Sequence, residues 1–95
     1  DLPMDSAVEV ACRITADGPK PVATGALKLP ISGYVHMMKS FERLVCEAAV
    51  TGDRDLAVTA LNINPLCPSD ALANIVVDEL IEAHKEYLPQ FTKNK

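Results

Sequence analysis

The stretch "AAVTGDRDLAVTALNINPLCPSD", residues 48–70, carries the signals for one helix end, one complete short helix and one helix start. Gly52 is a typical residue after a helix C-terminus, because glycine adopts the left-handed backbone conformation without a side-chain clash. Asp53 follows at once, and its carboxylate can accept backbone N–H groups at the positive start of the next helix. The pattern therefore predicts that one helix ends at about residue 51 and that another begins at 54.

The second half of this stretch predicts an equally sharp boundary. Asn62 or Asn64 can end the short helix, and Pro65 cannot continue it because proline lacks the backbone donor. Ser69 is a favoured N-cap for the helix that follows. We therefore predict a short helix over 54–63 between two tight links. Such a corner is expected to let the long helices on either side lie antiparallel.

Helical periodicity extends on both sides of this corner. A first helix is predicted over 32–51 and a third over 70–88, with Pro89 ending the third. The helices are thus long, short and long. The residues expected to face the core are Val35, Met37, Met38, Phe41, Leu44, Val45, Ala48, Ala49 and Val50 in the first helix, Leu56, Ala57, Ala60 and Leu61 in the second, and Leu72, Ile75, Val76, Leu80, Ala83 and Tyr87 in the third.

The N-terminal third has the period of a strand instead. The stretch "AVEVACRIT", residues 7–15, alternates between apolar and mostly polar side chains, which predicts a half-buried strand. Its apolar face would carry Val8, Val10, Cys12 and Ile14.

A hairpin follows from the next residues. "ADGPKP" at 16–21 has the chemistry of a turn, and "VATGAL" at 22–27 can return as a second strand. We therefore predict an α+β fold, with an antiparallel strand pair at about 7–28 followed by three helices. Two strands alone are marginal in water, so partner strands are expected in a part of the protein that this sequence does not contain.

Length and composition narrow the class of protein. The chain has 95 residues, of which 48% are hydrophobic, and a net charge of −4. The length favours one domain over 1–95. The negative charge gives no electrostatic reason to expect nucleic acid or an anionic membrane as a partner. No apolar run reaches the roughly 20 residues that span a bilayer.

The chain opens without an initiator Met and almost inside a strand, so we expect it to be a piece of a longer protein.

Cysteine and histidine residues are not grouped in a way that indicates a catalytic or metal site. Three cysteines without paired spacing are expected to be reduced thiols in a cytoplasmic protein. Cys12 and Cys46 are interpreted as small core residues, because a metal site on Cys46 and Glu42 would need further ligands. His36 and His84 lack the orienting carboxylate that a catalytic histidine needs.

Charged residues are interpreted as structural. Arg43 and Glu47 are four apart on the first helix, which predicts a surface ion pair. The cluster Asp53-Arg54-Asp55 could suggest an anion site at a helix start. However, Asp53 would bring its own negative charge there, so we interpret it as a cap.

Several strings in the chain resemble the C-terminal end of family 4 glycoside hydrolases, and most closely their 6-phospho-β-glucosidase branch. The resemblance extends over about residues 5–91, and "AVEVACRIT" is similar to the family's late strand. The matching pieces are Phe41-Glu42-Arg43-Leu44, Glu47-Ala48-Ala49, Thr51-Gly52-Asp53, Ala60-Leu61, Asn64-Pro65-Leu66, Asp78-Glu79 and Tyr87-Leu88-Pro89-Gln90-Phe91.

The resemblance implies a fold and an activity for a longer parent enzyme. The fold would be the C-terminal part of the lactate/malate dehydrogenase-like fold of family 4 glycosidases. The parent would bind NAD on an N-terminal dinucleotide-binding domain, use a divalent metal, typically manganese, and act in the cytoplasm as a homo-oligomer. It would hydrolyse phosphorylated β-glucosides by oxidation, elimination, addition of water and return of the hydride, outside the usual two-carboxylate scheme.

The motifs that bind the dinucleotide and the metal and supply the catalytic base in the family have no match in this sequence. The four glycines do not form a G-x-G-x-x-G motif. The family's metal-binding Cys is followed by Asn, whereas Cys67 is followed by Pro68. Tyr34 and Tyr87 do not match the setting of the family's catalytic base. We therefore expect no catalytic, cofactor-binding or metal-binding residue in this chain, and no turnover by the chain alone.

Two questions stay open at the level of sequence. Glu42, Arg43 or Glu47 can face the active-site cleft or a subunit interface of a complete enzyme. The alternative function is a self-standing helical module that buries the Met/Val face of the helix over 32–51 against a partner protein. The sequence also leaves open which phosphorylated glycoside or anomer is cleaved, and the oligomeric state.

Overall fold

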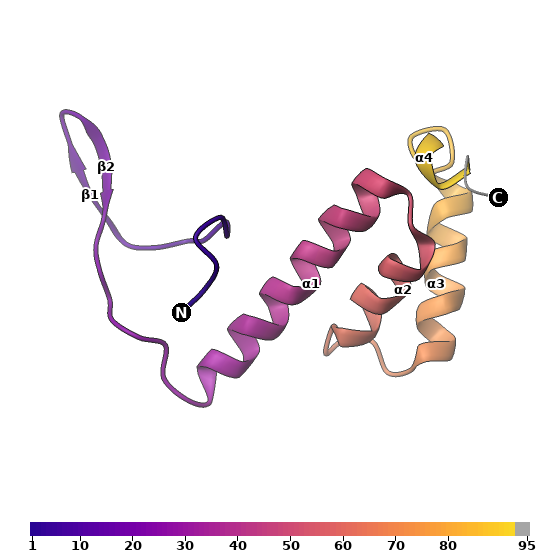
Figure 1. Ribbon diagram of the computed structural model, residues 1–95, viewed down its shortest axis with the longest axis horizontal. Coiled ribbons are helices and arrows are strands. Elements are labelled where there is room, and N and C mark those ends of the chain that lie inside the picture. Colours follow the sequence, from indigo (N-terminus) through magenta and orange to yellow (C-terminus); the bar gives the residue numbers. More distant parts are fainter. Residues whose placement is uncertain (93–95) are drawn as a thin grey trace.

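Two strands and then four helices follow one another along residues 1–92, which the computed structural model describes (Figure 1). The elements are β1 (Cys12–Thr15), β2 (Gly18–Pro21), α1 (Ile31–Thr51), α2 (Arg54–Ile63), α3 (Asp70–Ala83) and α4 (Pro89–Thr92). β1 and β2 are antiparallel. The predicted α+β fold, a strand pair followed by long, short and long helices, is confirmed, and the one-turn α4 is an addition to it.

The hairpin reverses earlier than the sequence pattern predicts. The second strand is β2 and not residues 22–27, and β1 covers only the end of the predicted strand at 7–15. The N–H of Asp17 donates to Thr15 Oγ1 at 3.2 Å, and this hydroxyl donates to Gly18 O at 2.8 Å. The placement of the second strand was wrong because these contacts close the turn within two residues.

The corner between α1 and α2 forms as predicted. Gly52 has a φ of +73°, and its N–H donates to Ala48 O at 2.8 Å, which closes the end of α1. The Asp53 carboxylate accepts the N–H groups of Asp55 and Leu56 at 2.9 and 3.1 Å. Because one residue ends α1 and the next caps α2, the chain needs only two residues between the helices.

The link between α2 and α3 also follows the predicted caps. Asn64 is the C-cap of α2, and its side-chain oxygen accepts the N–H of Leu66 at 3.0 Å. Ser69 Oγ accepts the N–H of Leu72 at 3.2 Å at the start of α3. Pro65 and Pro68 keep the link between these caps out of a helix.

The long helices do not lie antiparallel, contrary to the expectation. α2 packs between α1 and α3, and in Figure 1 the chain rises along α1, descends along α2 and rises again along α3. Two successive reversals return the chain to its first direction. α1 and α3 therefore run in the same general sense, and α2 separates them.

The core lies between α2 and α3 and is built largely from small side chains. Its buried members are Val58, Ala73 and Val77, and the residues packed against them are Ala57, Leu61, Cys67 and Ile81. Ala48 on α1 and Ala60 on α2 are also buried. Small side chains at these positions let the helix backbones approach closely.

The apolar face of α3 that meets the core is not the predicted one. Ala73, Val77 and Ile81, spaced by four residues, pack toward α2. Of the predicted residues, Val76 is half-buried, and Leu72, Ile75, Leu80, Ala83 and Tyr87 are exposed. α3 is apolar on two sides, and the apolar period alone does not say which side meets α2.

The predicted apolar face of α1 is covered only in part. Ala48 is buried, whereas Val35, Met37, Met38, Phe41 and Leu44 are half-buried and Val45, Ala49 and Val50 are exposed. The short α2 is the main neighbour of α1 and is half its length, so it leaves much of the stripe to solvent.

α3 is shorter than the predicted helix over 70–88, and Pro89 begins α4 instead of ending α3. The fixed φ of proline suits the first position of a helix, which is why both roles fit the same residue. Gln90 Nε2 donates to Ala49 O at 2.7 Å and holds α4 against the end of α1. The loose tail predicted for 92–95 lies almost wholly outside the described residues.

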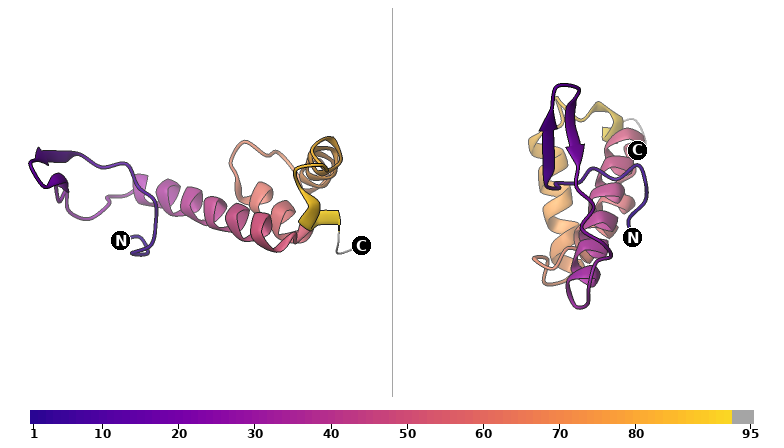
Figure 2. Two further views of the ribbon diagram at one scale, coloured as in Figure 1. Left: turned by 90° about the horizontal axis from the view of Figure 1, so that it is seen from above. Right: turned by 90° about the vertical axis from the view of Figure 1, so that its left-hand side faces the viewer.

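The molecule is more extended than a closed domain. Its radius of gyration is 17.1 Å and its extents are 49 × 33 × 18 Å, whereas a compact domain of this length has a radius of about 12 Å. Figure 2 shows that the hairpin stands beyond one end of α1, clear of the other helices. Among the described helices, none combines the length and hydropathy needed to cross a bilayer.

Candidate functional site

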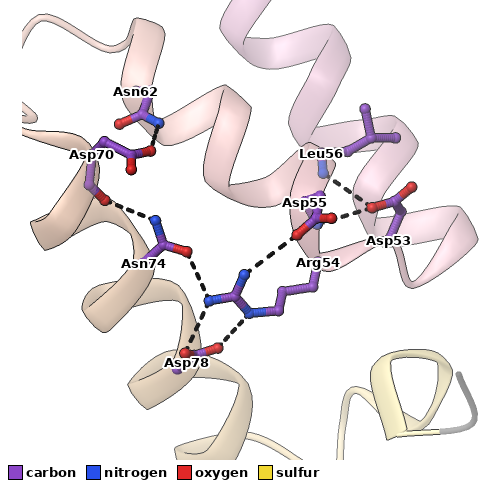
Figure 3. A network of polar contacts seen from close by, with 8 residues as sticks. All are labelled: Asp53, Arg54, Asp55, Leu56, Asn62, Asp70, Asn74 and Asp78. Carbon is purple, nitrogen blue, oxygen red and sulfur yellow. Dashed lines mark hydrogen bonds and ion pairs between the residues drawn. The ribbon is translucent and has the colours of Figure 1, made fainter. Parts of the chain in front are cut away.

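Arg54 joins α2 to α3 through a fork of polar contacts (Figure 3). Its Nε and Nη2 donate to the two carboxylate oxygens of Asp78 at 2.6 and 2.9 Å. Nη2 also donates to Asn74 Oδ1 at 2.9 Å, and Nη1 donates to Asp55 Oδ1 at 3.4 Å. A bidentate contact defines the relative orientation of both partners. Arg54 therefore fixes how the start of α2 approaches the middle of α3.

The same network continues along α3 to the link that precedes it. Asn74 Nδ2 donates to the backbone O of Asp70 at 2.9 Å, and Asn62 Nδ2 donates to the Asp70 carboxylate at 2.6 Å. The hydrogen bonds to Asp78 raise the pKa of Arg54, so the guanidinium stays charged at every physiological pH. This arrangement holds α2 and α3 together.

A cleft of about 940 Å³ lies beside this network. Its walls carry the carboxylates of Asp53, Asp55, Asp78 and Glu82, the Arg54 guanidinium and the apolar side chains of Ile81 and Phe91. The N–H groups that open α2 could bind an anion, but the Asp53 carboxylate accepts two of them. The acidic walls and the occupied helix start make this cleft unsuitable for a phosphate, and Asp53 acts as the predicted cap.

The N-terminal segment lies beside α1 and forms a second polar site with it. Arg43 donates to both carboxylate oxygens of Asp5 at 2.7 and 3.1 Å. Lys39 Nζ donates to Ala7 O at 2.5 Å and contacts the Glu42 carboxylate. These contacts join a segment without regular secondary structure to the middle of the long helix.

The predicted pair of Arg43 with Glu47 does not form, because Asp5 takes the guanidinium in a bidentate contact. The structure nevertheless brings Glu42, Arg43 and Glu47 to one cleft of about 420 Å³, which Asp5 and Cys46 also line. This cleft runs between the N-terminal segment and α1.

Acidification is expected to release the N-terminal segment from α1. The hydrogen bond to Arg43 and the charge of Arg43 hold the pKa of Asp5 below its usual value of 3.8. A depressed pKa in the folded state contributes stability above the unfolded value, and this contribution disappears as the pH falls through the folded value. The N–H of Ser6 donates to Pro3 O at 3.0 Å, and its protection, measured as the exchange rate relative to an unstructured peptide at the same pH, should therefore fall as the pH drops below about 4.

Asp5→Asn is the matched control for this titration. It removes the charge and leaves the size of the side chain, so exchange at Ser6 should already be faster at pH 7. The Asp5–Arg43 contribution to its pH dependence should then be absent. Equal exchange in the two proteins at pH 7 would show that the ion pair does not hold the segment.

The remaining candidate residues lie apart from each other. Cys12 and Cys46 are exposed, so the interpretation of both as core residues was wrong, and only Cys67 packs against the core. Cys12 lies in β1, and Cys46 lines the cleft between the N-terminal segment and α1. His36 lies on α1 and His84 is the C-cap of α3, and both side chains are exposed.

The described residues do not fit a divalent metal or a nicotinamide dinucleotide. Within residues 1–92 no three His, Cys, Asp or Glu side chains converge in a way that could hold a metal ion. Gly52 precedes a helix start, as glycine does in dinucleotide sites, but the Asp53 carboxylate occupies the N–H groups that would face a pyrophosphate.

Sequence reasoning missed the contacts of Arg54 with Asp78 and of Arg43 with Asp5. The partners are 24 and 38 residues apart, and no local pattern links them. The Asp78 contact depends on which face of α3 meets α2, and the Asp5 contact depends on the path of an irregular segment. For the contact between Arg54 and Asp78, the only indication in the sequence was an arginine directly after the N-cap residue Asp53.

The strand pair and the capped helical corner define an α+β domain. The family 4 glycosyl hydrolase C-terminal domain matches residues 1–67. The chain therefore belongs to this family of C-terminal domains.

Its relatives are named phosphoglycosidases. The "Probable 6-phospho-beta-glucosidase" of Bacillus subtilis (strain 168) is 57% identical over 90 residues, which are 95% of this chain and 20% of that protein. The "6-phospho-beta-glucosidase" of Escherichia coli (strain K12) is 37% identical over 96% of this chain and 20% of its own length. The "Maltose-6'-phosphate glucosidase" of Fusobacterium mortiferum is 32% identical over 86% of this chain and 19% of its own length. The chain thus spans about a fifth of the curated relatives that it matches.

Proposed function

We propose that residues 1–95 form a single C-terminal structural domain of a 6-phospho-β-glucosidase. The observation that carries this proposal is the 57% identity over 95% of the chain to a relative named as such an enzyme. The extended shape supports it, because a radius of gyration of 17.1 Å leaves apolar faces that a larger protein would cover.

The parent enzyme is proposed to hydrolyse phosphorylated β-glucosides in the bacterial cytoplasm, where a sugar phosphotransferase system delivers phosphorylated disaccharides. NAD and manganese, bound by other parts of the parent, would supply the oxidation and the polarisation that labilise the glycosidic bond. In this proposal no residue of the present chain is catalytic, binds a cofactor or binds a metal.

The residues of this chain supply rigidity instead. Gly52 and Asp53 set the angle between α1 and α2, and Arg54 holds α2 on α3. The N-terminal dinucleotide-binding domain of the parent would pack on the exposed apolar faces of α1 and α3. The present chain would also contribute to the contacts between subunits of a homo-oligomer. Glu42, Arg43 and Glu47 line one cleft and are our candidates for residues that reach such an interface.

The isolated chain is expected not to hydrolyse a chromogenic 6-phospho-β-glucoside, even with NAD and Mn²⁺ added. The physical reason is that none of its described side chains pair a base with a group to deprotonate. Release of chromophore is measured against a blank without protein. Hydrolysis above that blank would contradict the proposal.

A reading frame upstream of Asp1 with glycine-rich and Cys-Asn motifs would support the proposal. A start codon directly before Asp1 would favour a self-standing interaction module instead.

A further inference from the structure

The two edges of the β1–β2 hairpin differ in their free backbone groups. The register pairs Cys12 with Pro21, Arg13 with Lys20, Ile14 with Pro19 and Thr15 with Gly18. Beyond it, the N–H of Val22 donates to Ala11 O at 2.9 Å. Hydrogen-bonded and non-bonded pairs alternate along an antiparallel ladder. The Arg13–Lys20 pair is therefore bonded, and the residues next to it on each strand direct their backbone groups outward.

β2 presents a closed edge and β1 an open one. The outward positions of β2 are Pro19 and Pro21, which have no N–H to donate to a further strand. The outward positions of β1 are Cys12 and Ile14, each with an N–H and a C=O. Within residues 1–92, β2 is the only strand that pairs with β1. A third strand can therefore add to β1 but not to β2.

The apolar side chains of β1 are exposed, although the alternating sequence predicts that they are buried on one face. Cys12 and Ile14 share one face of the hairpin, and Ile14 is 78% exposed. Further back along the alternating stretch, Val8 and Val10 are 52% and 46% exposed. Alternation of this kind is typical of a strand with one buried face. Residues 1–92 do not bury that face.

We propose that β1, extended back toward Val8, pairs along its outer edge with a third β-strand from the remaining part of the parent enzyme. The inference rests on the proposed function, because that parent polypeptide supplies the strand. The same part of the parent covers the apolar face of Val8, Val10, Cys12 and Ile14. The occupant is an extended segment that offers N–H and C=O groups to Cys12 and Ile14 and apolar side chains to the shared face.

A second copy of this chain fits the edge less well. β1 has four residues, and two such strands paired edge to edge bury far less than the roughly 1,200 Å² of a standard interface. The matched segment is 20% of the Bacillus subtilis relative. About four-fifths of a homologous enzyme is thus available to supply the strand and the cover.

A chimera tests the inference. In it, this chain replaces the matching C-terminal segment of the Bacillus subtilis relative, and amide hydrogen exchange is compared with that of the isolated chain. The N–H groups of Cys12 and Ile14 should exchange at least about tenfold more slowly in the chimera, because only there do they meet a strand. Ile14→Pro removes one outward donor and should restore fast exchange at Cys12. Ile14→Val keeps the donor and should keep the protection.

The outcomes separate this inference from the proposed function. A chimera that hydrolyses a 6-phospho-β-glucoside, but whose Cys12 and Ile14 amides exchange as fast as in the isolated chain, would overturn the third strand and leave the proposed function standing. Protection that appears in the isolated chain and rises with its concentration would assign the edge to a second copy and overturn the inference. An insoluble or inactive chimera would count against the proposed function, and with it against this inference.

Discussion

Replacement of Gly52 by alanine is expected to lower the free energy of unfolding of this chain by about 2–4 kcal/mol. The residue has a φ of +73°, where a side chain is strained, and a Cβ built there would lie 2.2 Å from the backbone O of Gln90. Relief of this overlap requires α4 to move, which breaks the hydrogen bond from Gln90 to Ala49. Urea unfolding followed by circular dichroism measures the loss.

Two controls divide this effect into its causes. Gly33→Ala places a Cβ in open space within α1, so it should be neutral or stabilise by up to about 1 kcal/mol. In a chain that ends at Leu88, the Gln90 carbonyl is absent, and Gly52→Ala should cost only the backbone strain of about 1–2 kcal/mol. An equal cost in the full and shortened chains would show that the overlap with Gln90 is not important.

Ala73→Leu should destabilise the chain by about 1–3 kcal/mol, because it adds atoms where α2 and α3 are already in contact. Ala73 is 0% exposed and packs in the cluster with Val58 and Val77. The larger side chain must push the helices apart, which also stretches the contact between Arg54 and Asp78. Urea unfolding gives the change in stability, and exchange of the Arg54 side-chain N–H groups reports the loss of the contact.

Ala71→Leu is the matched control, since Ala71 lies two residues away on the exposed side of α3. The same change in volume should there alter stability by less than about 0.5 kcal/mol. If the two substitutions cost the same, the assignment of the core to the Ala73 face would be wrong.

Local chemistry made the helical corner predictable. The left-handed preference of Gly52 and the carboxylate of Asp53 act within a few residues of their own position, so the sequence contains everything that decides the boundary. Ser69 works in the same way at the start of α3. Resemblance to family 4 glycosidases also rested on this stretch and was confirmed by the match over residues 1–67.

Features that depend on packing between distant residues were not predictable in this way. α3 offers apolar side chains on two faces, and only contact with α2 selects Ala73 and Val77 over Leu72 and Ile75. Arg54 finds Asp78 only because that face was selected. Of the alternating stretch at 7–15, only the end forms a strand in the described residues. Val8 and Val10 were predicted to be buried, but they are 52% and 46% exposed in the described residues, so that prediction was wrong for residues 1–92.

The most direct test of the account is the initial rate at which the chimera hydrolyses a chromogenic 6-phospho-β-glucoside with NAD and Mn²⁺ supplied. We expect a rate within about tenfold of that of the Bacillus subtilis relative, because the catalytic groups are not exchanged and a tenfold change corresponds to only about 1.4 kcal/mol in the barrier. The relative without its C-terminal fifth should show no hydrolysis. A soluble, folded chimera that is no faster than this truncated protein would contradict the claim that the chain is the structural C-terminal domain of such an enzyme.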